Sequence, residues 1–138
     1  MTFQVGQAAI VVDASVAVSA LRAQLGWESQ LRGWIESNVM LLAPAHFGHE
    51  VANALLRGLP EEAADAEELL EQLFVVGIET ADRGRSGLLG SMRLARRHGL
   101  TIYDAAYLDL ALDVDAALAT LDRDLAAAAA RERVAVIG

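Results

Sequence analysis

Four acidic residues at widely separated positions are the side chains of this sequence best suited to carry out chemistry. Asp13 directly follows an apolar run that reads as a buried strand, and Asp122 lies three residues beyond another run, which ends at Ala119. Open parallel sheets bind ligands outside the carboxyl ends of their strands, so both acids are expected at the same sheet edge. Carboxylate oxygens gathered in this way suit a hard divalent cation.

Two further acids fall on predicted helices. Asp104 lies in the first turn of a helix after Thr101, and Glu50 lies at the border of the apolar stripe of another helix. Each of the four acids also has a purely structural interpretation. Asp13 and Asp122 can each cap the helix that follows, and Thr101 with Asp104 has the spacing of a capping box. Glu50 can be an ordinary solvated helix residue.

The composition excludes several other chemistries. All 11 basic residues are arginine, and lysine and cysteine are both absent. This excludes P-loop NTPases, lysine Schiff-base enzymes, thiol nucleophiles and cysteine–zinc scaffolds. The formal net charge of −8 is at first evidence against a nucleic-acid partner, although six of the acids fall within residues 60–73. The length of 138 residues predicts a single domain spanning residues 1–138.

Predicted strands and helices alternate along the chain. Strands are predicted over residues 8–12, 39–43, 74–78, 116–119 and 134–137. Helices are predicted over residues 25–36, 47–55, 61–73, 82–98, 102–112 and 125–132. This alternation predicts an α/β fold with a central, mostly parallel sheet of four to five strands flanked by helices. The sequence has no window of 18 apolar residues, so we expect a cytoplasmic protein that does not associate with membranes.

Four short motifs occur in order along the chain. They are residues 10–15 (IVVDAS), 44–55 (PAHFGHEVANAL), 100–108 (LTIYDAAYL) and 120–125 (TLDRDL). Together they resemble the PIN-domain family, especially the VapC-type toxins of bacterial toxin–antitoxin pairs. The resemblance implies a three-layer, PIN-like α/β domain. His46, Phe47 and His49 depart from the leucine-rich segment that the family commonly has before its glutamate.

The resemblance also implies a set of site residues. The catalytic acids would be Asp13, Glu50, Asp104 and Asp122. Asp13 and Asp104 would bind the metal directly, Asp122 directly or through water, and Glu50 would orient or deprotonate the attacking water. Supporting roles would fall on Ser15, Asn53, Thr120 and Asp124. His46 and His49 are alternative ligands, although a histidine at the surface or the core edge needs no such role.

Oxygen ligands without cysteine favour Mg²⁺ or Mn²⁺ over zinc. The implied reaction is metal-assisted hydrolysis of RNA phosphodiester bonds, which needs no covalent nucleophile. Guanidinium groups bind phosphate in a bidentate manner, so an arginine-rich segment is a candidate track for the RNA backbone. These arginines can equally be a solvated helix face: Arg83, Arg85, Arg93, Arg96 and Arg97.

The leading hypothesis is a toxin endoribonuclease that forms a homodimer and is inhibited by a small VapB-like antitoxin. Two alternatives stay open. One is a catalytically inactive PIN-fold binding module that works through complex formation. The other is a PIN-like DNA nuclease, although the chain shows none of the added segments that such enzymes carry.

Overall fold

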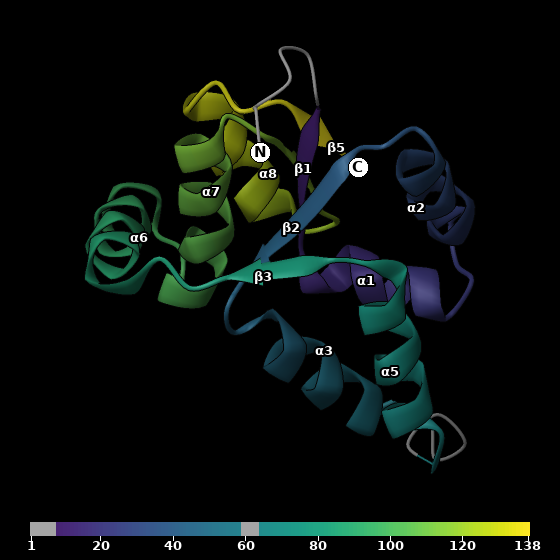
Figure 1. Ribbon diagram of the computed structural model, residues 1–138. Helices are drawn as coiled ribbons and strands as arrows, with labels where there is room; N and C mark the ends of the chain where they lie inside the picture. Colours follow the sequence, from purple (N-terminus) through teal and green to yellow (C-terminus); the bar gives the residue numbers. More distant parts are fainter. Residues whose placement is uncertain (1–7, 59–63) are drawn as a thin grey trace.

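The computed structural model describes residues 8–58 and 64–138, and its centre is a five-stranded parallel sheet (Figure 1). The strands are β1 (Ala9–Val12), β2 (Met40–Pro44), β3 (Glu79–Ala81), β4 (Ala117–Ala119) and β5 (Val136–Ile137). Their order across the sheet is β3-β2-β1-β4-β5, and every neighbouring pair is parallel. This confirms the predicted sheet and places β1 at its centre.

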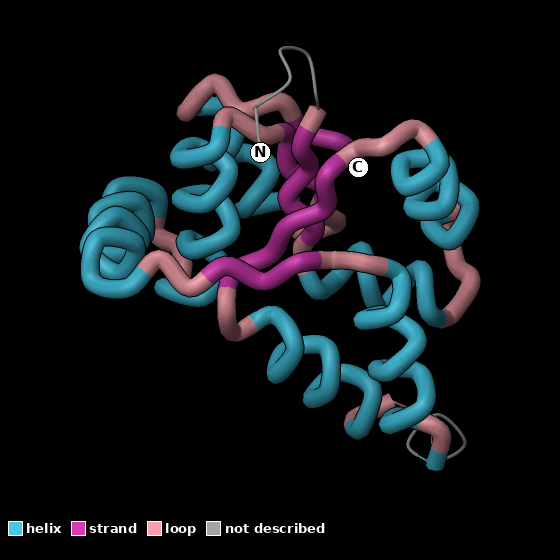
Figure 2. The backbone as a smooth tube through the Cα atoms, in the orientation of Figure 1, coloured by secondary structure: helices cyan, strands magenta, loops and turns pink. Residues whose placement is uncertain are grey.

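Helices cover both faces of the sheet, which gives three layers (Figure 2). They are α1 (Ala14–Leu21), α2 (Trp27–Glu36), α3 (Phe47–Leu56), α5 (Ala66–Val76), α6 (Gly84–His98), α7 (Ile102–Val114) and α8 (Arg123–Arg131). Helices α1, α2, α3 and α5 pack together on one side, whereas α7 and α8 cover the other side and α6 packs against α7. Within the described ranges, no helix combines the length and the apolar character needed to cross a bilayer.

The core explains why the strands read as continuous apolar runs. Val11 and Val12 of β1 and Leu118 of β4 are fully buried, because helices cover both faces of the sheet. Phe47 and Val51 of α3 complete this core from one side. Phe47 and Val51 thus anchor α3, the helix that carries Glu50, against the sheet.

The strand predicted over residues 74–78 is wrong. Residues 74–76 continue α5, Gly77 ends the helix in a left-handed conformation with φ of 100°, and β3 begins only at Glu79. A short apolar run fits a buried strand and a helix end equally well, so periodicity alone could not separate them. The predicted helix over residues 61–73 is confirmed from Ala66 onward, and residues 61–63 lie outside the described part of the chain.

The carboxyl end of α6 is joined to the end of α8 through Glu132. Its Oε2 lies 2.6 Å from Nε2 of His98 and accepts a hydrogen bond of 2.8 Å from Nη1 of Arg97. The bonds from His98 and Arg97 lower the pKa of Glu132 below its usual value. The ionised carboxylate therefore stabilises the folded chain.

We expect Glu132→Gln to lower the free energy of unfolding at neutral pH by about 1 kcal/mol or less, since the pair is partly solvated. A lowered folded-state pKa gives stability that is present above the unfolded-state pKa of Glu132 and is lost as the pH falls through the folded-state value. The difference in the free energy of unfolding between the wild type and Glu132→Gln should therefore become smaller in acid. Urea unfolding at neutral pH and at pH values below 4.5 measures it, and a constant difference across that range would contradict the assignment.

Candidate active site

Asp13 lies at the carboxyl end of the central strand. Its amide donates a hydrogen bond of 3.1 Å to the carbonyl of Ala119, which ends the neighbouring strand β4. Asp13 is 5% exposed, and its Oδ1 caps α1 by accepting a hydrogen bond of 3.1 Å from the amide of Val16. The capping interpretation is therefore confirmed, and the cap lies at the sheet edge where a ligand site was expected.

Two hydroxyl groups hold the Asp13 carboxylate. Ser15 Oγ donates to Oδ1, and Thr120 Oγ1 donates to Oδ2. The same hydroxyls accept hydrogen bonds from the amides of Leu121 and Asp122, at 3.1 Å and 3.0 Å. Burial raises the pKa of Asp13, and the bonds from Ser15 and Thr120 oppose that shift. Ser15 and Thr120 thus both bind the Asp13 carboxylate and the backbone that follows β4.

Asp122 caps α8, as its position before that helix predicted. Its Oδ1 accepts hydrogen bonds from the amides of Asp124 at 2.9 Å and Leu125 at 3.1 Å. Thr120 links Asp122 to Asp13, because its hydroxyl accepts from one residue and donates to the other. The side chain of Asp124 is exposed and makes no hydrogen bond with the described residues.

Asp104 lies in the first turn of α7, where the predicted cap is present. Thr101 Oγ1 accepts a hydrogen bond of 3.1 Å from the Asp104 amide. Burial raises the pKa of Asp104, the charge on Asp122 raises it next, and Glu50 and Asp13 add smaller contributions. A hydrogen bond with Thr101 opposes these effects. Asp104 is therefore close enough to Asp122, Glu50 and Asp13 to be affected by their charges, although these acids come from separate segments of the chain.

Glu50 is the half-buried acid on α3, and two residues hold its Oε1. The hydroxyl of Tyr107 on α7 donates a hydrogen bond of 3.0 Å to this oxygen. His46 Nε2 lies 2.7 Å from the same oxygen, in an orientation that makes no hydrogen bond. Burial and the charge on Glu50 raise the pKa of the Tyr107 hydroxyl far above its usual value, so this hydroxyl stays a donor. The side-chain amide of Asn53, the predicted supporting group on α3, is exposed and makes no hydrogen bond with the described residues.

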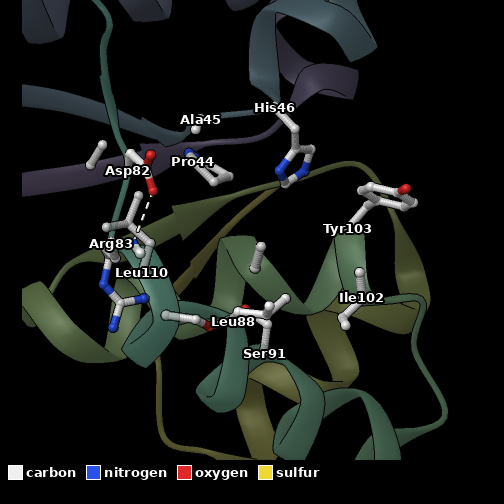
Figure 3. Close-up of a pocket in the computed structure, with 14 residues that line it drawn as sticks. Pro44, Ala45, His46, Asp82, Arg83, Leu88, Ser91, Ile102, Tyr103 and Leu110 are labelled. Atoms are coloured by element: carbon white, nitrogen blue, oxygen red, sulfur yellow. Dashed lines mark hydrogen bonds between the residues drawn. The ribbon is translucent and has the colours of Figure 1, made fainter.

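An aromatic cluster borders the acids. The ring of His46 packs edge-on against Tyr103 and Tyr107, with centroid distances of 5.4 Å and 5.3 Å. Figure 3 shows His46 and Tyr103 on one side of a cavity of about 260 Å³. The sequence reasoning missed both tyrosines as site residues. Tyr107 follows Asp104 by three residues, and that helical spacing could have indicated a shared face.

The chemistry of the donor set fits a divalent cation. Carboxylate oxygens are hard ligands, and the mutual repulsion that raises the pKa of Asp104 would be relieved by a positive charge. Among residues 8–58 and 64–138, no three acidic or histidine side chains stand close enough to coordinate one ion as they are placed. Joint coordination by Asp13, Asp104 and Asp122 would require these side chains to move toward one another.

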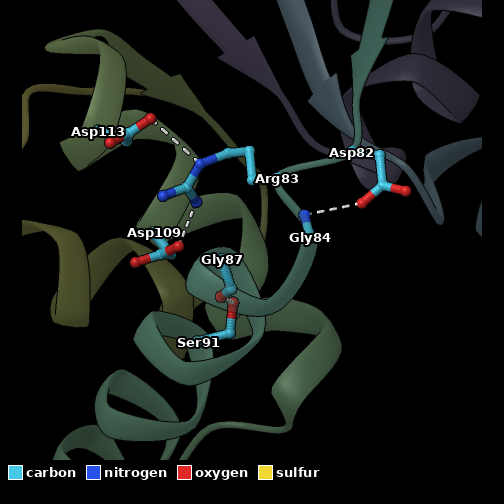
Figure 4. A network of polar contacts seen from close by, with 7 residues as sticks. All are labelled: Asp82, Arg83, Gly84, Gly87, Ser91, Asp109 and Asp113. Carbon is cyan, nitrogen blue, oxygen red and sulfur yellow. Dashed lines mark hydrogen bonds and ion pairs between the residues drawn. The ribbon is translucent and has the colours of Figure 1, made fainter.

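The predicted arginine track on α6 is only partly available for RNA. Arg83 Nε lies 3.2 Å from the carboxylate of Asp113, and its Nη1 binds that of Asp109, which joins α6 to α7 (Figure 4). Arg97 Nη1 lies 2.8 Å from Glu132. The remaining members are exposed and have no ion-pair partner in the described part of the chain: Arg85, Arg93 and Arg96.

Comparison with known proteins agrees with the motifs and the fold. The family model of the PIN domain matches residues 10–131. The chain belongs to the PIN-domain family. Ribonuclease VapC3 from Pyrobaculum aerophilum is 36% identical over 123 residues, which cover 85% of this chain and 92% of that protein.

Solved structures carry the same PIN fold. PAE2754 from Pyrobaculum aerophilum is 26% identical, with a TM-score of 0.68 over 88% of this chain and 86% of its own. The structure of VapBC2 from Rickettsia felis was solved with a DNA fragment from the VapBC2 promoter, and its sequence is 12% identical. Its TM-score is 0.69 over 94% of this chain and 97% of its own, which shows the likeness of fold. The three-layer α/β architecture is therefore that of PIN domains.

Proposed function

We propose that this chain is a divalent-metal-dependent endoribonuclease and the toxin of a toxin–antitoxin pair. The proposal is supported by geometry and charge together: the Thr120 hydroxyl joins Asp13 to Asp122 by hydrogen bonds, and the charges of Asp122, Glu50 and Asp13 all raise the pKa of Asp104. The likeness to Ribonuclease VapC3 supports RNA as the substrate. The binding-module alternative gains no support, because all four acids are present in the sequence and the charges of three of them act on Asp104.

Asp13, Asp104 and Asp122 are the residues that would hold the ion, and their oxygen donors favour Mg²⁺ or Mn²⁺. A bound divalent ion supplies positive charge for the phosphate oxygens and lowers the pKa of water. The chain itself fixes the position of Asp13 through Ser15 and Thr120. These bonds hold the central carboxylate in one orientation before any substrate binds.

Glu50 is the proposed orienter or general base for the attacking water. The hydrogen bond from Tyr107 and the close contact with His46 both fall on Oε1. Oε2 makes no hydrogen bond with the described residues, so it remains able to accept a proton from water. The Tyr107 hydroxyl thus orients the base without neutralising it.

The proposed partners are RNA, a second copy of this chain and a small VapB-like antitoxin, all in the cytoplasm. Carboxylates are natural targets for an antitoxin arginine, because guanidinium groups bind them in a bidentate manner. A groove of about 250 Å³ between α1, α2 and α5 offers apolar surface for such a partner, with the exposed side chains of Ile35 and Val76 among its lining residues. We also propose that residues 1–138 form a single domain.

The proposed activity is tested by mapping new RNA ends on total RNA treated with the wild type and with Asp13→Asn. Asparagine keeps an N-cap acceptor for α1 but removes the ligand charge. We expect discrete new ends with the wild type that disappear with EDTA and in the variant. Structured DNA, digested in parallel, should stay intact.

Three results would redirect this proposal. Equal cleavage by both proteins would exclude Asp13 from the chemistry. Cleavage of DNA in preference to RNA would favour the DNA-nuclease alternative. A preparation that binds a partner protein but neither cuts RNA nor binds divalent ions would favour the inactive binding module.

A further inference from the structure

The cavity beside the acids has the size for one flat ring system. Its volume of about 260 Å³ falls below the roughly 300–1,000 Å³ of pockets for drug-sized ligands. Two of its lining residues adjoin the candidate site. His46 Nε2 lies 2.7 Å from Glu50 Oε1, and Tyr103 directly precedes Asp104. A group in this cavity would therefore lie next to the reacting phosphate.

The lining favours a base over a phosphate group. Leu88, Ile102 and Leu110 contribute apolar surface, and Figure 3 shows Asp82 and Arg83 at the other side of the cavity from Tyr103. The Arg83 guanidinium is already bound to carboxylates of α7 (Figure 4). The amide of Gly84 donates to Asp82 Oδ1 at 2.9 Å. The cation and this amide are thus already engaged, whereas the aromatic and aliphatic surface is open.

Tyr103 presents the surface on which a base could stack. Its exposed fraction is 61%, although it packs edge-on against His46. The His46 ring is in turn fixed by its edge contact with Tyr107, which is buried. The exposed Tyr103 ring, held in place by its contact with the His46 ring, offers a flat surface for stacking. RNA-binding proteins bind unpaired bases on aromatic rings of this kind.

We propose that this cavity binds one unpaired nucleobase of the RNA, from a nucleotide adjacent to the scissile phosphate, against Tyr103 and His46. The inference rests on the proposed ribonuclease function and adds a base subsite to it. A base can enter only after it leaves its neighbours in a helix, so the subsite restricts cleavage to single-stranded segments. The base subsite would select the cut position, while the carboxylates perform the reaction.

An abasic scan of a short single-stranded RNA tests the base subsite. Each nucleotide in turn is replaced by an abasic one, and binding to the wild type is measured by fluorescence anisotropy in EDTA, so that no cleavage occurs. We expect one abasic position to weaken binding by about 5- to 160-fold, the range for loss of one stacked base. Tyr103→Ala should bind the intact RNA more weakly by a similar factor and should no longer respond to that abasic position.

Two control variants distinguish loss of base stacking on Tyr103 from damage to the fold. Tyr103→Phe keeps the ring and should keep the abasic response. Val75→Ala, at an exposed site on α5 that does not line the cavity, should also keep it. With divalent ion added, the wild type should cut next to the position that the scan identifies.

The outcomes distinguish the two proposals. RNA binding with the expected abasic response but no cleavage would overturn the ribonuclease function and leave the base subsite intact. A flat abasic scan with the wild type, a persistent response in Tyr103→Ala, or no RNA binding at all would overturn the base subsite. Cleavage of RNA by a protein whose binding affinity is the same at every abasic position would support the ribonuclease function and overturn the base subsite.

Discussion

Asp104→Asn is expected to reduce RNA cleavage by about 10³-fold or more, because loss of a ligand charge removes several kcal/mol of transition-state stabilisation. The charges of all three other site acids raise the pKa of Asp104. Initial rates on one defined RNA oligonucleotide, at saturating divalent ion, measure the loss.

The same variant should be more stable than the wild type when no metal is present. Burial and neighbouring carboxylates raise the pKa of Asp104, so its ionised form destabilises the folded chain. A raised carboxyl pKa means that stability is greatest in acid and falls as the pH rises from the unfolded-state value through the folded-state value. Removal of this charge should therefore raise Tm in EDTA at neutral pH and flatten that pH dependence.

Asp115→Asn is the matched control for this experiment. Asp115 ends the same helix, is exposed, and has φ of 54°, a conformation that asparagine tolerates. The control should change neither the cleavage rate nor Tm. If Asp104→Asn instead lowered Tm while it abolished cleavage, the residue would be acting through the fold, and its assignment as a ligand would fail.

Divalent ions should raise the Tm of the wild type by about 10 °C at a concentration near 100 times Kd, since such binding adds about 2.7 kcal/mol to the folded state of a domain of this size. The physical reason is relief of the repulsion among the four acids. The increase should weaken in acid, because protons compete with the metal for Asp13 and Asp104, whose pKa values are both raised.

Thermal scans with Mg²⁺, Mn²⁺ and EDTA measure this effect. NaCl at matched ionic strength controls for screening, which acts on any group of like charges. In Asp104→Asn, NaCl should raise Tm almost as much as in the wild type. Divalent ions should raise it little further. Equal shifts with NaCl and with divalent ions, or equal shifts in both proteins, would contradict a specific metal site.

The local features of the site were predictable from the sequence. Asp13 follows a run that is buried because it is apolar throughout, and Thr101 caps the helix of Asp104 through a contact across three residues. Asp122 caps α8 in the same local way. The alternation of strands and helices then placed Asp13 and Asp122 at one sheet edge, since parallel strands end together.

Tertiary structure decided which side chains are free and which are already bound. Arg83 looked like a candidate for the RNA backbone, yet it binds carboxylates of α7 that follow it by 26 and 30 residues. Tyr107 holds Glu50 from 57 residues away, and Thr120 holds Asp13 from 107 residues away. Residues 74–76, predicted as part of a strand, form the end of α5 instead. So short an apolar run is compatible with both a helix and a strand, and the packing of the chain decides between them.

The sequence by itself therefore determined the α/β class, the position of Asp13 after a strand and the capping roles of Asp13, Thr101 and Asp122. These follow from periodicity and from capping contacts across a few residues, which spacing along the chain controls. Only the packed structure decided the partners of Glu50 and Arg83 and formed the cavity beside Tyr103. Such contacts join elements that are distant in the chain, so they depend on how the helices pack against the sheet and against one another.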